Sequence, residues 1–314
     1  MSIIENAVNK LSKTEPAFAA PPAQTPAAMH APDSLIELAV RTPEAAEHPQ
    51  PEEKSAPQAT VRSAQAADSG TQIQSINRAK LKKMGLVTPD GERSQIAEEF
   101  RLIKRPLLMN AFGQGAAPVK NGNLIMVTSS LPGEGKSFCA INLAISIAME
   151  MDRTVLLVDA DVAKPRLPYY LGLHTERGLL DVLRDEQLAL ADVLIKTDID
   201  NLTILPAGRT YRQATELLAS EAMNSLIRDI QHRYPDRIVI FDSPPLLATS
   251  EAGVLAAHMG QIVMVVEAEK TPQAALKEAL AQIESCEVIG MVLNKTTTLP
   301  GANYYYGNYG AYGA

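Results

Sequence analysis

The segment that most constrains this chain is Ser130–Ser137, with the sequence SLPGEGKS. The apolar run Leu124–Val127 before it is typical of a buried strand, and Phe138–Ala144 after it is typical of a helix. A strand, a glycine-containing loop and a helix in this order are the context of a phosphate-binding P-loop. Its glycines let backbone N–H groups face a phosphate, and the start of the helix adds partial positive charge. The usual first glycine is replaced by Ser130.

The loop predicts roles for its side chains. We expect Lys136 to reach the β- and γ-phosphate oxygens of ATP, and the Ser137 hydroxyl to bind Mg²⁺. The remaining nucleotide contacts are expected from the other loop residues and the first helical turn, namely Pro132, Gly133, Glu134, Gly135 and Phe138. A turn that merely contains Gly-Lys-Ser is the alternative, and the flanking strand and helix disfavour it.

Downstream of the loop, short apolar runs alternate with helical patterns. Strands are predicted at 154–158, 202–205, 237–241, 261–266 and 288–293, and helices at 214–234, 251–259 and 271–285, with Ser220 a candidate break in the first of these helices. Strands this apolar are buried on both faces, which predicts an α/β fold with a mostly parallel P-loop NTPase sheet flanked by helices. Ligands of such sheets bind at the C-terminal ends of the strands.

Three carboxylates follow two of these strands. Asp159 and Asp161 come just after the strand at 154–158, and Asp242 follows the strand at 237–241 in a Walker B pattern. Together with Lys136 they are the candidate catalytic residues, and Ser137, Asp161 and Asp242 are the candidate Mg²⁺ ligands. Asp159 or Asp161 is the candidate general base. The alternative for each of these two aspartates is a helix cap or turn former.

The last residues of the chain hold five of its nine tyrosines, Tyr304, Tyr305, Tyr306, Tyr309 and Tyr312, spaced by Gly and Asn. Such spacing disfavours a packed strand or helix and predicts a flexible tail. A phenol has a pKa of about 10, so it needs a nearby base before it can attack phosphorus at neutral pH. These tyrosines are therefore candidate phosphate acceptors, and aromatic stacking on a neighbour is their alternative role.

The composition divides the chain into four parts. An Ala/Pro-rich segment at 1–75 is predicted to be a disordered arm, and its two apolar patches are either docking elements or transient helices. A basic and helical lead-in spans 76–120, the P-loop domain 121–298 and the tail 299–314. The cluster Arg78, Lys80, Lys82 and Lys83 is read as a solvated face or as a contact for lipid headgroups.

A helix is predicted over residues 94–108, and on it Glu98, Arg101 and Lys104 recur every three residues. They form either local ion pairs or a charged stripe that meets another subunit.

The net charge of -7 disfavours nucleic acid as a partner. The two separated cysteines, Cys139 and Cys286, fit a reduced cytoplasmic protein. We identify neither a run long enough for a membrane span nor a secretory leader, so membrane recruitment would depend on a partner.

The P-loop, the Asp159-Ala160-Asp161 pair, Asp242-Ser243-Pro244-Pro245 and the terminal tyrosines together resemble the bacterial tyrosine kinases of capsule and exopolysaccharide loci. The branch associated with exosortase loci is the most similar. The resemblance covers roughly residues 94–314. It implies an ATP- and Mg²⁺-dependent autokinase in which the aspartate pair is a second Walker motif, called A′, and the tail tyrosines are phosphorylated in trans. Ala163 stands where the family often has an Arg, which Lys164 could replace.

The resemblance also implies partners. A Glu-x-x-Arg-x-x-Arg stripe assembles rings in the family, and Glu98, Arg101 and Lys104 match it with Lys in the last place. A separate membrane-embedded chain-length regulator of polysaccharide export would recruit the kinase to the inner face of the cell membrane. A phosphotyrosine phosphatase is a further expected partner.

Two rival functions stay open from the sequence. A partition or positioning ATPase has the same fold, but its signature Lys would stand at Leu131. A nucleotide-gated scaffold of the polysaccharide machinery is the other. Asn294, after the last predicted strand, is either an adenine contact or part of a strand-end turn.

Overall fold

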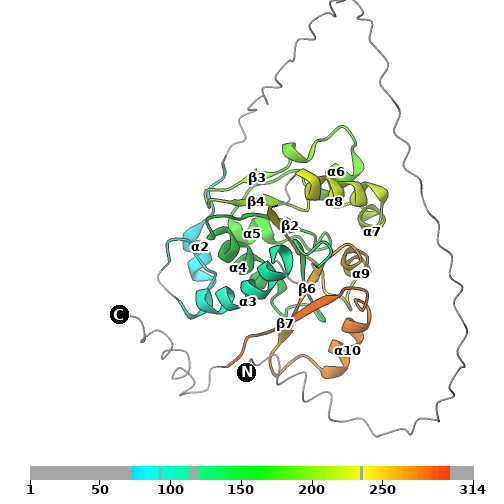
Figure 1. The fold of residues 1–314 in the computed structure, drawn as a ribbon. Helices are drawn as coiled ribbons and strands as arrows, with labels where there is room; N and C mark the ends of the chain where they lie inside the picture. Colours follow the sequence, from blue (N-terminus) through cyan, green and yellow to red (C-terminus); the bar gives the residue numbers. More distant parts are fainter. Residues whose placement is uncertain (1–72, 92–93, 114–118, 234–235, 298–314) are drawn as a thin grey trace, which may run out of the picture. The chain divides into compact units, whose positions relative to one another are not determined.

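The computed structural model describes residues 73–91, 94–113, 119–233 and 236–297. The predicted N-terminal arm lies outside these residues up to position 72, and the tail lies outside them from position 298. The described chain forms a seven-stranded sheet with helices on both faces (Figure 1). The predicted α/β class is therefore confirmed.

The sheet has the strand order β3-β4-β2-β5-β1-β6-β7, and every neighbouring pair is parallel except β3 and β4. Its strands are β1 (Leu124–Ser129), β2 (Thr154–Asp159), β3 (Ile195–Lys196), β4 (Leu202–Leu205), β5 (Arg237–Asp242), β6 (Gln261–Glu267) and β7 (Val288–Asn294). All side chains of β1 are buried, as the apolar run predicted. Because β1 lies between β5 and β6, the P-loop that follows it is at the middle of the sheet edge.

The helices form two layers. One face of the sheet packs against α2 (Arg78–Lys83), α3 (Gln95–Phe112), α4 (Lys136–Ala148) and α5 (Leu167–Leu171). The other packs against α6 (Leu179–Arg184), α7 (Ala214–Leu218), α8 (Glu221–Arg233), α9 (Glu251–Ala256) and α10 (Gln273–Ala281). Alternate side chains of each central strand therefore enter different cores, as expected for a sheet covered on both sides.

Three local features differ from or refine the predicted elements. The helix predicted at 214–234 is two helices, and the break lies at Ser220, whose hydroxyl donates to the carbonyl of Leu217 at 2.7 Å. The helix predicted at 94–108 continues to Phe112, with Pro106 inside it. Strand β3 was not predicted because it is only two residues long.

The lead-in packs into the same core as α4. Ile76, Leu81, Leu86 and Val87 are all buried. The Val87 N–H donates to Asn142 Oδ1 in α4 at 2.7 Å. We call residues 74–87 the strap, because they run from the β3 edge of the sheet to α4.

Two of the four basic residues of the cluster at 78–83 contact other protein groups and do not form a solvated face. Arg78 forms ion pairs with Asp90 and Asp198, and Lys80 lies over the Tyr169 ring at 3.6 Å from its centroid. Lys82 and Lys83 are exposed, as predicted. The prediction was wrong for Arg78 and Lys80 because α2 packs against α5, which brings protein partners to those two side chains.

The predicted charged stripe on α3 is also corrected. Glu98 and Arg101 are half-exposed and form an ion pair at 2.6 Å. Lys104 is buried; its amine donates to the Ser146 carbonyl at 2.6 Å and lies 2.5 Å from a Glu150 carboxylate oxygen. The six residue steps from Glu98 to Lys104 turn the helix by a net angle of about 240°. Lys104, the third residue of the stripe, therefore leaves the exposed face. The exposed part of the stripe is therefore Glu98 and Arg101.

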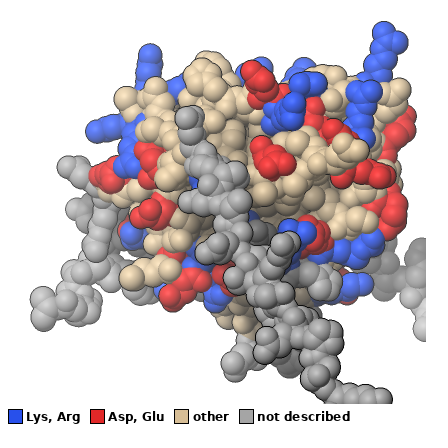
Figure 2. Space-filling model, turned by 90° about the horizontal axis from the view of Figure 1, so that it is seen from above, with Lys and Arg blue, Asp and Glu red and all other residues tan. Residues whose placement is uncertain are grey.

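On the face seen in Figure 2, basic and acidic side chains of the described residues are interspersed rather than gathered by sign. No helix among the described residues combines the length and the apolar character needed to cross a bilayer.

Candidate nucleotide site

The P-loop connects β1 to the first residue of α4, Lys136. Gly133 and Gly135 have φ values of 91° and 104°, in the left-handed region that favours glycine. A Cβ on Gly135 would lie 2.0 Å from Asn294 Nδ2, so both the backbone conformation and the available space require glycine there. The predicted order of strand, loop and helix is thus confirmed, and both glycines adopt a backbone conformation that favours glycine.

Lys136 and Asp161 meet at the centre of the site. The Lys136 amine donates to Asp161 Oδ2 at 2.6 Å, and both side chains are nearly buried. Burial alone would lower the pKa of Lys136, but Asp242, Asp161 and Asp159 outweigh it, and its pKa is raised above the usual value. The amine therefore stays charged at neutral pH.

Asp159 and Asp242 lie side by side on the paired strands β2 and β5, and both are fully buried. Asp159 Oδ2 accepts the Leu167 N–H at 3.0 Å. Asp159 Oδ1 and both oxygens of Asp242 have no hydrogen-bond partner of ordinary geometry among the described residues.

Both carboxyl groups have raised pKa values. Burial raises the pKa of Asp242 to about 6, against the opposing effects of Lys136 and of the neighbouring Ser137 hydroxyl. Burial, followed by repulsion from Asp242, raises the pKa of Asp159 well above its usual range. Unpartnered carboxylate oxygens in a buried site are stabilised by a cation, so this donor set fits Mg²⁺.

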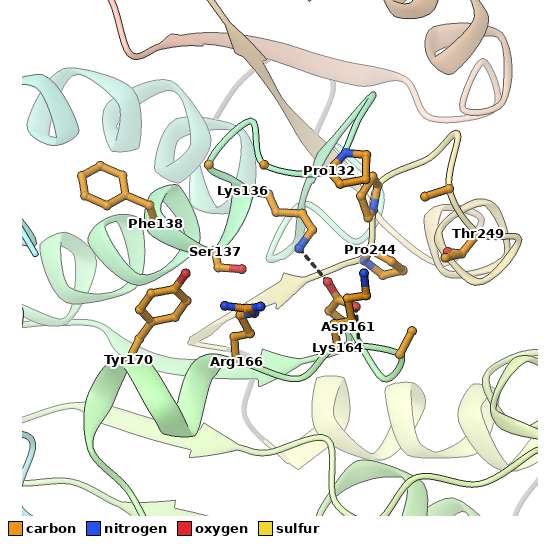
Figure 3. A pocket seen from close by; sticks show the side chains of 15 residues that line it. Pro132, Lys136, Ser137, Phe138, Asp161, Lys164, Arg166, Tyr170, Pro244 and Thr249 are labelled. Carbon is orange, nitrogen blue, oxygen red and sulfur yellow. Dashed lines mark hydrogen bonds and ion pairs between the residues drawn. The ribbon is translucent and has the colours of Figure 1, made fainter.

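A cavity of about 510 Å³ opens beside the P-loop (Figure 3). The loop side is lined by Pro132, Gly133, Gly135, Lys136, Ser137 and Phe138. The facing side is lined by Asp161, Ala163, Lys164, Arg166, Tyr170, Pro244, Pro245, Ala248 and Thr249. The structure therefore brings the P-loop, the end of β2 and the end of β5 around one space large enough for a nucleotide.

The comparisons with known proteins agree with this geometry. A family model described as an AAA domain matches residues 122–294, more than half of the chain. The chain is 30% identical over 235 residues to the tyrosine-protein kinase YwqD of Bacillus subtilis, covering 74% of this chain and 94% of that protein. This chain belongs to the bacterial tyrosine-protein kinase family.

The chain is also similar to the succinoglycan biosynthesis transport protein ExoP of Rhizobium meliloti, with 32% identity over 243 residues. The matched residues cover 73% of this chain but only 30% of ExoP. Several other relatives are likewise matched over only 23–32% of their own length. Among solved structures, the chimerical protein CapA2B2 superposes with a TM-score of 0.59 at 28% identity, covering 73% of this chain and 96% of that one.

The side chains of two residues predicted to contact nucleotide, Glu134 and Asn294, make hydrogen bonds within the protein. Glu134 is buried, and its carboxylate accepts the Leu131 N–H at 2.8 Å and the Thr271 hydroxyl. Asn294 Nδ2 donates to the Glu134 carbonyl at 2.9 Å, behind the loop. Neither side chain lines the cavity. Asn294 is therefore more than a strand-end turn, because it supports the P-loop backbone.

Lys295 extends this support. Its amine donates to the Gly133 carbonyl at 2.8 Å and lies 3.1 Å from Glu267 Oε2. The ends of β6 and β7 are thus tied to the P-loop by Glu267, Thr271, Asn294 and Lys295, which we call the brace.

Sequence reasoning missed part of the cavity wall. Arg166, Tyr170 and Thr249 line the cavity but were not assigned to nucleotide binding. Two basic residues, Lys164 and Arg166, directly after the A′ aspartates were the available signal. The five tail tyrosines lie outside the described residues, so their assignment as acceptors stays a prediction.

Proposed function

We propose that this chain is an ATP-dependent protein-tyrosine kinase that phosphorylates the C-terminal tyrosine cluster of another copy of itself. The observation that carries the proposal is the contact of Lys136 with Asp161 beside the buried pair Asp159 and Asp242. This arrangement offers one cation to a terminal phosphate and several carboxylates for a metal and a proton. Family membership and the tyrosine-rich tail favour tyrosine as the acceptor.

In the proposed reaction the tyrosine oxygen forms a bond to the γ-phosphorus of ATP. The bond from that phosphorus to the β,γ-bridging oxygen breaks, and its electron pair leaves with ADP. The phenol proton passes to a carboxylate. We favour Asp161 for this role over Asp159, because only Asp161 lines the cavity. Lys136 neutralises charge on the terminal phosphate.

Of the three predicted ligands Ser137, Asp161 and Asp242, we assign Mg²⁺ to Ser137 and Asp242, because Asp161 is paired with Lys136 and is the favoured proton acceptor. When bound, the ion would supply positive charge that offsets the negative charge of the phosphates. The unpartnered oxygens of buried Asp242 support this assignment.

The deciding experiment is phosphotyrosine mass spectrometry of the purified chain after incubation with ATP and Mg²⁺. The matched controls are Lys136→Met and a variant with all five tail tyrosines changed to Phe. Phosphate on the tail of the wild type alone would support the kinase. ATP hydrolysis without tail phosphate would favour the partition ATPase, and nucleotide binding with neither activity would favour the scaffold.

We further propose that the kinase acts in capsule or exopolysaccharide polymerisation and export. The name of the relative ExoP supports a link to polysaccharide transport. The partner would be a membrane-embedded chain-length regulator on a separate chain, with the kinase in the cytoplasm at the inner face of the membrane. A phosphotyrosine phosphatase would reverse the modification. Co-purification of the regulator with the tagged kinase, from cells of the source organism, tests the first partner.

We propose that the chain self-associates, in a ring or a smaller oligomer, through Glu98 and Arg101, which are exposed on α3. Arg101→Ala is expected to weaken self-association in sedimentation without changing the melting temperature. Lys104→Met is the matched contrast, because Lys104 is buried and its loss should lower the melting temperature. Each added phosphate brings about -1.5 to -2 charges, so phosphorylated chains should sediment as smaller species.

A further inference from the structure

The turn between β2 and α5 presents two cations to the nucleotide cavity. Lys164 and Arg166 both line it, and Figure 3 shows Arg166 extending toward Ser137 and Lys164 extending toward Pro244. For neither side chain do the described residues supply a hydrogen bond or an ion pair. Lys136, by contrast, is already paired with Asp161 at 2.6 Å. The cavity therefore has two positive groups that protein carboxylates do not neutralise.

The backbone of this turn is held at both ends by the A′ aspartates. Asp161 Oδ1 accepts the Lys164 N–H at 3.1 Å, and Asp159 Oδ2 accepts the Leu167 N–H at 3.0 Å. Pro165 restricts the backbone between them. The backbone of Arg166 is thus held in a defined position, because the neighbouring Leu167 N–H donates to the fully buried carboxylate of Asp159.

The same two cations also border a second space. An open cavity of about 410 Å³ is lined by Lys164, Pro165, Arg166 and Tyr169. Lys164 and Arg166 are shared by both cavities, so they stand at the junction between them. An acceptor that approached the nucleotide along this second space would pass both cations.

We propose that Lys164 and Arg166 form an acceptor-side anion subsite that binds the γ-phosphoryl group during its transfer, with Arg166 as the principal ligand. This inference rests on the proposed kinase function and adds catalytic residues to it. A planar guanidinium can make two parallel hydrogen bonds to phosphoryl oxygens, which the Lys164 amine cannot. The segment Asn303–Ala314 has no ionised side chain at neutral pH, so the negative charge that the pair would meet is that of the phosphoryl group.

The first test measures binding and needs no kinase activity. Calorimetry compares ADP with the non-hydrolysable ATP analogue AMP-PNP, for wild type, Arg166→Ala and the exposed control Lys277→Ala on α10. In Arg166→Ala, AMP-PNP affinity should fall about 10-fold, as expected for losing a charged hydrogen bond of about 1.4 kcal/mol, while ADP affinity changes less than 2-fold. Equal losses for both nucleotides, or no loss for either, would overturn the subsite.

The second test measures transfer. Arg166→Ala should lower the rate of tail phosphorylation by about 10²- to 10³-fold at saturating ATP and raise the KM for ATP about 10-fold, in line with the loss of AMP-PNP affinity, and Arg166→Lys should recover part of the rate. Lys164→Ala should have a smaller effect. A wild type without tail phosphorylation would refute the kinase function and leave the binding test to decide the subsite alone. Full activity in Arg166→Ala, with wild-type binding of AMP-PNP, would refute the subsite but not the kinase.

Discussion

The two flanks of the P-loop are built on opposite principles. On the flank formed by the ends of β2 and β5, the carboxylates of Asp159 and Asp242 are buried with unpartnered oxygens and raised pKa values. On the flank formed by the ends of β6 and β7, the brace residues are linked to the loop by hydrogen bonds and ion pairs. The comparison teaches that one flank leaves carboxylate oxygens without protein partners, whereas the other holds the loop in shape.

The largest effect is expected from Asp242→Asn. Removing this carboxylate should lower Mg²⁺-dependent phosphoryl transfer by about 10³-fold, because a charged ligand is replaced by a neutral one. Nucleotide binding by equilibrium dialysis and tail phosphorylation by mass spectrometry measure the two consequences separately. Retention of more than a tenth of the wild-type rate would contradict the role of Asp242.

In the absence of nucleotide, Asp242→Asn should be more stable than the wild type, and this gain in stability should depend on pH. The pKa of Asp242 is raised to about 6 in the fold, above its ordinary value. The stabilising contribution of the protonated Asp242 carboxyl is therefore complete below about pH 4 and is lost as the pH rises through about 6. Thermal melts of Asp242→Asn and wild type should diverge between pH 4 and 8, by up to about 3 kcal/mol. A constant difference over this range would argue against a buried, strained carboxylate.

Gly135→Ala should disrupt the point where the brace meets the loop. The new Cβ would collide with the Asn294 amide, and the φ of 104° is unfavourable for alanine. We expect a lower melting temperature and a loss of ATP affinity of about 10-fold or more, because the loop must shift. Gly253→Ala in α9 is the matched control, since no atom lies within 4 Å of its new Cβ and alanine favours helix. If Gly135→Ala and Gly253→Ala had the same melting temperature and the same ATP affinity, the proposed support of the P-loop by the brace would be refuted.

The smallest effect is expected from Thr271→Val, which deletes one hydroxyl from the brace. This hydroxyl donates to Glu134 and accepts the Glu267 N–H at 3.0 Å. We expect a loss of stability of about 1 kcal/mol and a few-fold higher KM for ATP, with kcat within twofold. Thr203→Val in β4, remote from the cavity, serves as the control. A large fall in kcat would show that the brace takes part in chemistry as well as in support.

The reactive flank was largely predictable because its residues directly follow apolar strands. Asp159 and Asp242 are each the last residue of a strand, and parallel strands bring such ends together. The brace was not predictable, because Thr271 and Asn294 contact Glu134 across 137 and 160 residues of sequence. Spacing on a helix likewise predicted a shared stripe for Lys104 but could not show that α4 covers it.

The strap has a practical consequence for anyone who shortens this protein. A fragment beginning at the predicted helix of residue 94 would leave the core around Leu81 open to water and the Asn142 oxygen without its donor. It would also uncover the backbone of β3, which Gln74 now pairs, and bare strand edges promote aggregation. Burial of each large aliphatic side chain contributes roughly 1.5–3 kcal/mol. Expression of a well-behaved catalytic fragment should therefore start at or before Gln74.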